Sequence, residues 1–301
     1  CVDLTKDFPR GFWRPRPVRA LDHVSLAVER GEIFGLLGHN GAGKTTTLKL
    51  LLRLIFPTSG QARILGQPPG AAARQIGYLP ENPYFYDYLR CHELVAYYAE
   101  LSGVPKAERA ARVAWALERT GMTAAAQTPL RKCSKGMVQR VGLAQAIVHR
   151  PAVLFLDEPM SGLDPLGRRQ VRDLILELKA EGATVVFSTH ILSDAEQLCD
   201  RVAILRKGRV AAAGRLEQLL AGEEDRVEIA YLEAGAAAHR EAPRAALWSE
   251  LERLRGAGAT VTAINPVRRS LEEIFLSPDS SAAPGAAAGT GSRAKAQEAP
   301  Q

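Results

Sequence analysis

Short hydrophobic runs alternate with amphipathic stretches over much of the chain. The run Ile33–Leu37 is apolar, and a glycine-rich segment and a helical pattern over Lys44–Phe56 follow it. Two further apolar runs, Val153–Leu156 and Val185–Phe187, flank an amphipathic helix expected over Pro165–Ala180. Strands that are apolar on both faces are typical of parallel sheets covered by helices. The pattern therefore predicts an α/β fold with a parallel sheet.

The N-terminal segment is expected to form an antiparallel β subdomain. Val2–Phe8 mixes apolar and polar residues, and Leu21–Val28 alternates them, as strands with one buried face do. Between them, Pro9–Arg19 is rich in proline and arginine and is predicted to be an exposed hairpin loop. Later in the chain, Val202–Leu205 and Arg209–Ala213 are expected to form two strands joined by a Lys-Gly turn.

The helical signals define the domain organisation. From Pro83 to Leu130 the pattern is helical, with breaks at Ser102–Pro105 and Gly121, and a further helix is expected over Val138–His149. A helical insert, at about 83–145, inside a main domain over 1–222 accounts for this pattern.

The C-terminal part carries weaker signals. A strand at Val227–Leu232 and helices at Ala245–Arg255 and Leu271–Leu276 predict a small accessory domain over 223–277. From 278 to 301, Ala, Gly, Ser, Pro and Gln dominate without an apolar period, so this tail is expected to be disordered.

Composition sets loose limits on function. Apolar residues make up 46% and charged residues 24% of the chain, which is ordinary for a globular protein. A net charge of +6 does not choose between nucleic acid, an anionic membrane surface and a phosphate ligand. The four cysteines form no CxxC pair, which favours reduced thiols over a zinc site or a disulfide framework. Since no apolar run is long enough to span a bilayer, any membrane role is expected to come through a partner.

A phosphate-binding loop is the strongest chemical signal. The segment Gly38–Thr45 fits GxxxxGK[ST] and lies between a predicted strand and a predicted helix. Glycines let backbone N–H groups turn toward a polyphosphate, Lys44 can reach the β- and γ-phosphates, and the Thr45 hydroxyl can bind Mg²⁺. A glycine-rich turn that merely caps a helix is the alternative. The predicted nucleotide-binding residues here are Gly38, His39, Asn40, Gly41, Ala42, Gly43, Lys44, Thr45 and Thr46.

Two carboxylates follow the strand Val153–Leu156. Ligands of open α/β sheets gather at the carboxyl ends of the strands, so Asp157 and Glu158 are expected to face the phosphate loop. Asp157 is suited to Mg²⁺, and Glu158 to polarising a water for attack on the γ-phosphate. A solvent-facing acidic strand end is the alternative.

Three further elements are candidates for the same chemistry. Ser134 is placed to cap the helix that follows it, and Gly136 permits close approach of an anion. An ordinary capped helix is the alternative. Asp164 follows closely after Glu158, and His190 ends the strand beside it, where a γ-phosphate contact competes with a packing or surface role.

The order of these motifs resembles that of ABC-transporter nucleotide-binding domains over nearly all of residues 2–220. The resemblance implies a P-loop ATPase fold and a phosphate-binding Walker A loop at Gly38–Thr45. It also implies a signature motif at Cys133–Met137, Walker B at Val153–Asp157, the catalytic base Glu158, a D-loop at Ser161–Asp164 and a switch histidine at His190. Lys44, Glu158 and His190 are then the expected catalytic residues.

Three positions need separate comment. Phe8 looks like the family's aromatic residue that stacks on adenine, with an edge-strand packing role as the alternative. In the signature, Cys, Lys and Met replace the Leu, the first Gly and the Gln of the family's usual LSGGQ, while Ser134 and Gly136 remain. The Lys135 side chain either adds charge at the phosphate or faces water. Glu81 stands where the family has its Q-loop glutamine and is expected, with Thr45 and Asp157, to contact Mg²⁺ or its water.

The resemblance also implies partners and a place in the cell. The altered signature motif and the glutamate at the Q-loop position are similar to those of a bacterial branch of the family. The ATPases of this branch pair with separate, small multi-helix permeases and usually drive export. Two copies are expected to meet head to tail, with ATP held by Lys44, Thr45 and Phe8 of one copy and by Ser134 and Gly136 of the other. Lys135 and Asp164 are also expected to be nucleotide-binding residues. The protein is expected at the cytoplasmic side of the membrane, touching it through the permease. The aromatic residues Tyr84, Phe85, Tyr86 and Tyr88 are either the permease contact or core packing of the helical insert.

Two other classes of function are weaker alternatives. A soluble ABC ATPase acting on nucleic acid or ribosomes usually carries tandem cassettes or long coiled coils, whereas this chain has one cassette and evenly spread charge. No nucleic-acid partner is therefore expected. A kinase or a GTPase shares only the phosphate loop; the signature motif argues against the first and the lack of an NKxD-type motif against the second.

Overall fold

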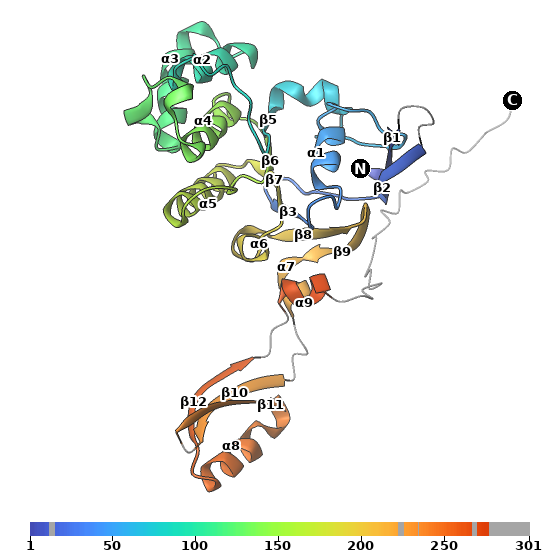
Figure 1. The fold of residues 1–301 in the computed structure, drawn as a ribbon, viewed down its shortest axis with the longest axis vertical. Helices are drawn as coiled ribbons and strands as arrows, with labels where there is room; N and C mark the ends of the chain where they lie inside the picture. The colour runs from blue at the N-terminus through green and yellow to red at the C-terminus, as the bar shows by residue number, and fades with distance from the viewer. Residues whose placement is uncertain (12–15, 222–225, 234, 267–269, 277–301) are drawn as a thin grey trace, which may run out of the picture.

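A six-stranded sheet forms the centre of the molecule, in the spatial order β5-β6-β7-β3-β8-β9 (Figure 1). The computed structural model describes residues 1–276 except 12–15, 222–225, 234 and 267–269. The strands of this sheet are β3 (Ile33–Leu37), β5 (Ile76–Leu79), β6 (Val153–Asp157), β7 (Thr184–Thr189), β8 (Arg201–Arg206) and β9 (Arg209–Arg215). All pair in parallel except β9, which adds antiparallel to β8. This pairing confirms the predicted parallel sheet. The strands β3, β6 and β7 are buried along their whole length, as their apolar sequences predict.

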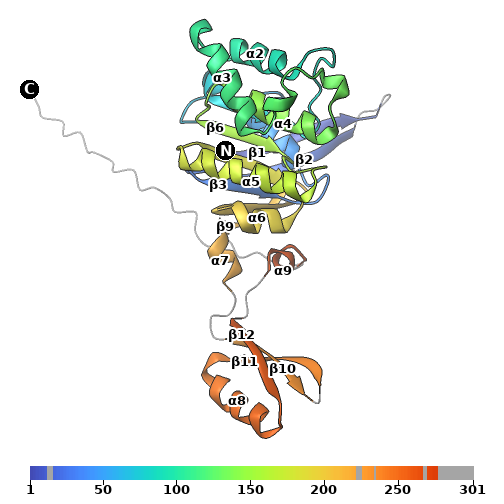
Figure 2. The ribbon, with the colours of Figure 1, turned by 90° about the vertical axis from the view of Figure 1, so that its left-hand side faces the viewer.

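The two faces of the sheet carry separate hydrophobic clusters. Phe34 and Leu36 of β3 pack in one cluster with the helix that follows the phosphate loop and with the N-terminal strands, whereas Ile33 and Leu37 pack in the other with the helices of residues 91–198. This alternation follows from the pleat, which sends successive side chains to opposite faces. One covering helix is α1 (Lys44–Leu51), labelled in Figure 1. The others are α4 (Lys135–Ile147), α5 (Pro165–Ala180) and α6 (Leu192–Leu198), visible from the side in Figure 2.

Two of these helices differ from the expected bounds. The helix predicted over Lys44–Phe56 ends at Leu51, and Arg53 then takes a left-handed backbone with φ of 58°. The helix predicted over Val138–His149 begins one turn earlier, because Ser134 caps it and accepts a hydrogen bond from the Met137 N–H at 3.2 Å.

The N-terminal strands form a second, antiparallel sheet. It consists of β1 (Val2–Arg10), β2 (Arg16–Val24) and β4 (Ser59–Gln61), in the order β2-β1-β4. The prediction of a loop over Pro9–Arg19 was wrong at both ends, since β1 and β2 stay paired as far as Arg10 and Arg16. The predicted strand Leu21–Val28 ends at Val24, and there the Ser25 hydroxyl accepts the hydrogen bond from the Asp3 N–H at 2.9 Å.

The helical insert contains α2 (Cys91–Leu101) and α3 (Lys106–Arg119), which pack against α4. The predicted breaks are confirmed: Gly103 and Gly121, which follow the two helices, both have positive φ, where glycine meets no Cβ strain. The short 3₁₀ turns of the main domain are η1 (Pro69–Gln75), η2 (Thr123–Ala125) and η3 (Leu130–Lys132), and α7 (Leu216–Leu220) follows β9.

Residues 226–266 build a small unit with its own core. Its strands β10 (Arg226–Glu233), β11 (Ala236–Pro243) and β12 (Thr260–Pro266) form a sheet in the order β11-β10-β12, with η4 (Arg244–Ala246) and α8 (Leu247–Gly256). Val227, Ile229 and Leu254 are the buried centre of its hydrophobic cluster.

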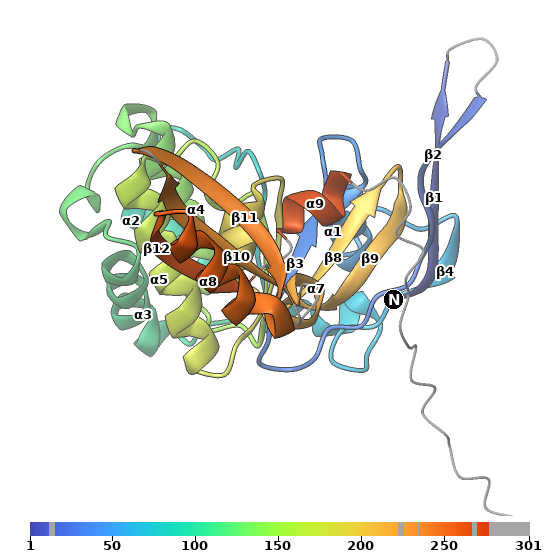
Figure 3. The ribbon, with the colours of Figure 1, turned by 90° about the horizontal axis from the view of Figure 1, so that it is seen from below.

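The last described helix, α9 (Leu271–Leu276), coincides with its predicted bounds and packs on the main domain. Leu271 is fully buried in the main cluster, and its N–H donates to Glu196 of α6 at 3.0 Å. Figure 3 shows α9 beside β8, where the Arg206 guanidinium donates to the Phe275 carbonyl. The tail over 278–301 lies outside the described residues, as does the predicted domain boundary at 222. Within the described ranges, every helix is too short or too polar to cross a bilayer.

Candidate functional site

The phosphate loop, Gly38–Thr45, connects β3 to α1 and wraps around the ammonium group of Lys44. Lys44 Nζ donates to the Gly38 carbonyl at 2.7 Å and to the His39 carbonyl at 3.4 Å. Gly43 has a φ of 110°, and a Cβ there would lie 2.5 Å from the Leu21 side chain. Glycine is therefore required for the turn, and its absence of a side chain leaves the backbone free to approach a ligand.

The carboxylate of Asp157, at the end of β6, lies next to the start of α1. Its Oδ1 accepts hydrogen bonds from the Thr45 hydroxyl at 3.2 Å and from the Ser188 hydroxyl at 2.5 Å. Its Oδ2 is buried and has no hydrogen-bond partner among the described residues. A buried carboxylate oxygen without a partner, beside a hydroxyl, is a donor set that fits Mg²⁺, which prefers oxygen ligands.

Glu158 is held between the two other predicted catalytic residues. Its Oε1 lies 3.3 Å from Lys44 Nζ, and its Oε2 lies 2.9 Å from Nδ1 of His190. The Glu158 side chain is buried, and its backbone takes a φ of 51°, a left-handed conformation that costs energy for a residue other than glycine. The Ser188 carbonyl and hydroxyl both accept from the Glu158 N–H, at 3.2 and 3.1 Å, and so hold this turn in place.

The structure thus brings five predicted residues into one constellation: Lys44, Thr45, Asp157, Glu158 and His190. They come from the start of α1 and from the ends of β6 and β7, which meet at the carboxyl edge of the sheet. A cation, a hydroxyl, two carboxylates and an imidazole in this arrangement can bind a metal–triphosphate and orient a water toward it.

Ser134, Lys135, Gly136 and Asp164 lie together in a different place. They line a hollow of about 470 Å³ between the starts of α4 and α5, and none of its lining residues belongs to the phosphate loop. Ser134 and Asp164 each cap a helix, the second by accepting from the Gly167 N–H at 3.0 Å. Two helix N-termini opening on one hollow, with Lys135 between them, favour an anion there.

The described contacts of Phe8 and Glu81 do not connect either residue to the phosphate-loop constellation or to the hollow between α4 and α5. The Phe8 ring, on β1, is 38% exposed and has Lys6 Nζ at 5.1 Å from its centroid. Glu81 is exposed just beyond the end of β5. Their roles at adenine and at Mg²⁺ stay predictions, as does that of Thr46.

Three contributors to the site were missed in the sequence. Ser188 binds both acidic residues, and Gln139, buried in α4, donates to the Pro159 carbonyl at 3.2 Å. Phe275 of α9 stacks edge-on against His39 of the phosphate loop, with 4.6 Å between ring centroids. A glutamine among apolar residues of a helix was a signal for Gln139; a partner for Phe275 was not readable from the chain.

The charge of Asp157 also affects its neighbourhood. Burial and the Asp157 carboxylate raise the pKa of Tyr78, on the adjacent strand β5, to about 12. Tyr78 is therefore neutral at any physiological pH. The Gln145 amide donates to the Tyr78 carbonyl at 2.7 Å and ties the end of β5 to α4.

Comparison with known proteins shows the family of the chain. Residues 21–161 match the family described as ABC transporter. The chain is 37% identical over 258 residues to the uncharacterised ABC transporter ATP-binding protein MJ1023 of Methanocaldococcus jannaschii, covering 86% of this chain and 93% of that one. The chain belongs to the ABC transporter ATP-binding proteins.

Other members of the ABC family agree with this assignment. The chain is 48% identical over 226 residues to the uncharacterised ABC transporter ATP-binding protein sll0415 of Synechocystis. The matched region covers 74% of this chain and 64% of that relative's length. Among solved structures, the dimeric ABC cassette MJ0796 in a post-hydrolysis state with ADP and Pi is 25% identical, with a TM-score of 0.66 over 71% of this chain and 97% of that one. The fold of this chain is therefore that of the ABC cassettes.

Proposed function

We propose that this chain binds Mg·ATP between two of its own copies, hydrolyses the ATP and thereby drives transport, in the direction of export, through a separate membrane permease. The observation that carries the proposal is the contact of the buried Glu158 side chain with both Lys44 and His190, beside Asp157 with its unpartnered Oδ2. Lys44 would bind the β- and γ-phosphates, and Thr45 and Asp157 would hold Mg²⁺, which supplies charge neutralisation on the phosphates. Glu81 would contact Mg²⁺ through water.

In the described conformation Lys44 is already occupied by protein acceptors. Its ammonium contacts the Gly38 carbonyl and the Glu158 carboxylate, and both contacts must be exchanged when a triphosphate enters. Release of Oε1 from Lys44 frees Glu158 to accept a hydrogen bond from a water, while Nδ1 of His190 keeps hold of Oε2. Glu158 then acts as the general base, oriented by His190.

The second half of the site is proposed to come from the partner copy. Ser134, Lys135, Gly136 and Asp164 lie in a separate hollow that opens between two helix N-termini, so they complete a nucleotide site only if another copy supplies the phosphate loop. The dimeric state of the related cassette MJ0796 supports this arrangement. The γ-phosphate would join the two copies, and its loss on hydrolysis would let them separate.

The hydrolysis test compares three variants of the full chain. Lys44→Ala is expected to lose ATP binding, whereas Glu158→Gln keeps binding and loses at least about a hundredfold in turnover, the lower end of the range for loss of a general base. His190→Ala should also remove most of the turnover. ATP binding is measured by equilibrium dialysis and turnover by phosphate release. Undiminished hydrolysis by Glu158→Gln would overturn its assignment as the base.

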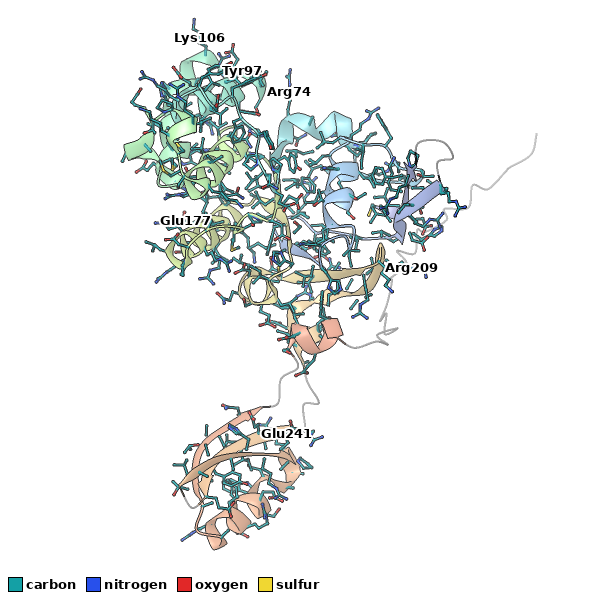
Figure 4. The ribbon with its side chains drawn as sticks, in the orientation of Figure 1. Arg74, Tyr97, Lys106, Glu177, Arg209 and Glu241 are labelled. Atoms are coloured by element: carbon teal, nitrogen blue, oxygen red, sulfur yellow. The ribbon has the colours of Figure 1, made fainter. Side chains whose placement is uncertain are left out.

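The permease contact is proposed at the exposed tyrosines after β5. Tyr84 is 96% exposed and Tyr86 and Tyr88 are exposed as well, whereas Phe85 and Tyr98 pack against the core with ring centroids 6.1 Å apart. The aromatic cluster therefore divides: Phe85 packs internally, and the three tyrosines are available to a partner. Tyr97 of α2, in the helical insert, is also exposed (Figure 4). Through this contact the protein would sit at the cytoplasmic face of the membrane.

Cross-linking tests that surface and export tests the direction. A cysteine introduced at Tyr86 should cross-link to the permease, and a cysteine at Trp248 of α8, which is also exposed, serves as the control. Inside-out vesicles that hold both proteins should accumulate substrate on addition of ATP. Cross-linking at Trp248 alone, or accumulation only in right-side-out vesicles supplied with internal ATP, would contradict the two parts of the proposal.

A further inference from the structure

Two thiols meet inside the helical insert, next to the signature hollow. Sγ of Cys91 lies 3.6 Å from Sγ of Cys133. Cys91 is the first residue of α2 and is fully buried, whereas Cys133 is half-buried and immediately precedes Ser134, the cap of α4. The two residues stand 42 positions apart in the chain, so the fold and not local sequence brings their sulfur atoms together.

The backbone around both thiols is fixed by hydrogen bonds. The Cys91 N–H donates to the Thr128 carbonyl at 3.1 Å, and the Leu130 N–H donates to the Leu89 carbonyl at 2.9 Å. The Cys91 thiol donates to the Thr128 carbonyl at 3.3 Å. The start of α2 and the turn that leads to Cys133 therefore form one unit, which keeps the sulfur atoms adjacent.

We propose that Cys91 and Cys133 are a redox-modification site: they close to a reversible disulfide that alters the position of Ser134 and so reduces ATP hydrolysis. The bond itself does not depend on the proposed ATPase function, whereas its effect on turnover does. A disulfide needs about 2.05 Å between sulfur atoms, so closure shortens the present separation by about 1.5 Å. Such a displacement moves Cys133, which is adjacent to Ser134 in the chain. The Ser134 hydroxyl is proposed to reach the γ-phosphate of the partner's nucleotide.

The oxidant is a small-molecule disulfide such as oxidised glutathione. The accessible Cys133 thiolate attacks one sulfur of it, forms a mixed disulfide and releases one glutathione thiolate, which takes up a proton. The Cys91 thiol then loses its proton, its sulfur attacks the Cys133 sulfur, and the second glutathione leaves as a thiol. Two protein thiols are oxidised and one disulfide is reduced to two thiols, so electrons and protons balance.

The burial of the two thiols fits these two roles. Cys133 is half-buried and can be reached by a small-molecule disulfide, whereas Cys91 is fully buried. Burial, and after it the hydrogen bond with Cys133, raises the pKa of Cys91 to about 12, so Cys91 stays protonated until the mixed disulfide is beside it. Cysteine pairs that oxidise transiently are the kind of disulfide found in reducing compartments.

The chemical test uses the reduced, purified full chain and oxidised glutathione. The expected result is loss of two of the four thiols and a linked peptide pair that contains Cys91 and Cys133, found by mass spectrometry after digestion without reductant. Cys1→Ser and Cys199→Ser should still form this link, and Cys91→Ser should instead keep glutathione on Cys133. A stable glutathione adduct on wild-type Cys133, or a link between two copies, would overturn the proposal. Cys91→Ala replaces Cys91→Ser if the serine variant fails to fold.

The functional test measures phosphate release before oxidation, after it, and after treatment with dithiothreitol. Oxidation should lower the turnover of the wild-type chain by at least about tenfold, since loss of one donor to a reacting group costs this much or more. Dithiothreitol should restore it, and the double variant Cys91→Ser, Cys133→Ser, which can form neither the disulfide nor a glutathione adduct at this site, should show the same turnover before and after oxidation. A fully linked wild-type chain with unchanged turnover would overturn the effect on Ser134. A reduced chain without hydrolysis would instead count against the proposed function, while the linked peptide would still report the site.

Discussion

At the residue scale, the acidic turn after β6 depends on one small hydroxyl. Ser188 donates to Oδ1 of Asp157 and accepts from the N–H of Glu158, so a single side chain orients the proposed metal ligand and the proposed base together. The motif itself was readable from the sequence, because two carboxylates after an apolar strand are a local pattern. Ser188 was not, because its partners are some thirty positions away and depend on β6 pairing with β7.

Removing that hydroxyl should weaken Mg²⁺ binding more than nucleotide binding. Ser188→Ala leaves Oδ1 of Asp157 with the Thr45 hydroxyl alone, and loss of such a supporting bond typically costs about 10–100-fold in metal affinity or activity. The Mg²⁺ concentration at half-maximal hydrolysis should rise accordingly. Ser249→Ala, on the exposed face of α8, is the control. Equal Mg²⁺ dependence of the two variants would contradict the role given to Ser188.

His149 gives a prediction about pH. Its Nε2 donates to the Ile76 carbonyl at 3.0 Å, and its Nδ1 is buried without a partner among the described residues. Burial lowers the pKa of His149 below the ordinary value of 6.5, so the unfolded chain takes up a proton more readily than the folded one. The free energy of unfolding should therefore fall as the pH drops through 6.5 and below, and be fully retained above it.

The matched variant is His149→Gln, whose amide can still donate to the Ile76 carbonyl but takes up no proton. Urea unfolding, followed by circular dichroism above and below the ordinary histidine pKa, should show a smaller loss of stability on acidification for the variant than for the wild type. An identical loss in both would show that His149 is not the group that titrates.

At the element scale, the sequence predicted best those elements whose pattern is local. The central strands and α5 are marked by apolar runs and by an amphipathic period, and α9 by the run Leu271–Leu276. β11 was missed because Ala236–Pro243 is rich in alanine and charged residues and is a strand only through its pairing with β10. The N-terminal hairpin was underestimated for a similar reason: Pro9 and Pro17 suggested a loop, but they lie opposite each other in a ribbon that needs few backbone donors there.

The packing of α9 predicts a stability effect on the main domain. Leu271 is fully buried among residues of that domain, so Leu271→Ala should lower its free energy of unfolding by about 2–5 kcal/mol. Leu54→Ala, at a position 57% exposed in the same domain, should change it by less than about 0.5 kcal/mol. Urea unfolding of both variants is the measurement. If the two variants are equally stable, α9 contributes nothing to the core.

At the scale of the whole molecule, the described chain holds two halves of a site in two places. The phosphate loop with its acidic residues lies at the carboxyl edge of the sheet, and the signature residues line a hollow at the starts of α4 and α5. Gln139 joins the two regions, because it belongs to the signature helix and contacts the turn after Glu158. The arrangement accounts for a nucleotide site that two copies complete together, with each copy giving its phosphate loop to one site and its signature residues to the other.

Analytical ultracentrifugation of the Glu158→Gln variant tests this claim most directly. With MgATP the variant should sediment as a dimer, and with MgADP as a monomer, because the γ-phosphate is the proposed link. Adding Ser134→Arg, which fills the partner's phosphate position, should abolish the dimer, whereas Ser249→Arg on the exposed face of α8 should not. If Glu158→Gln saturated with MgATP remains monomeric, both alone and with the permease, the sandwiched nucleotide is contradicted.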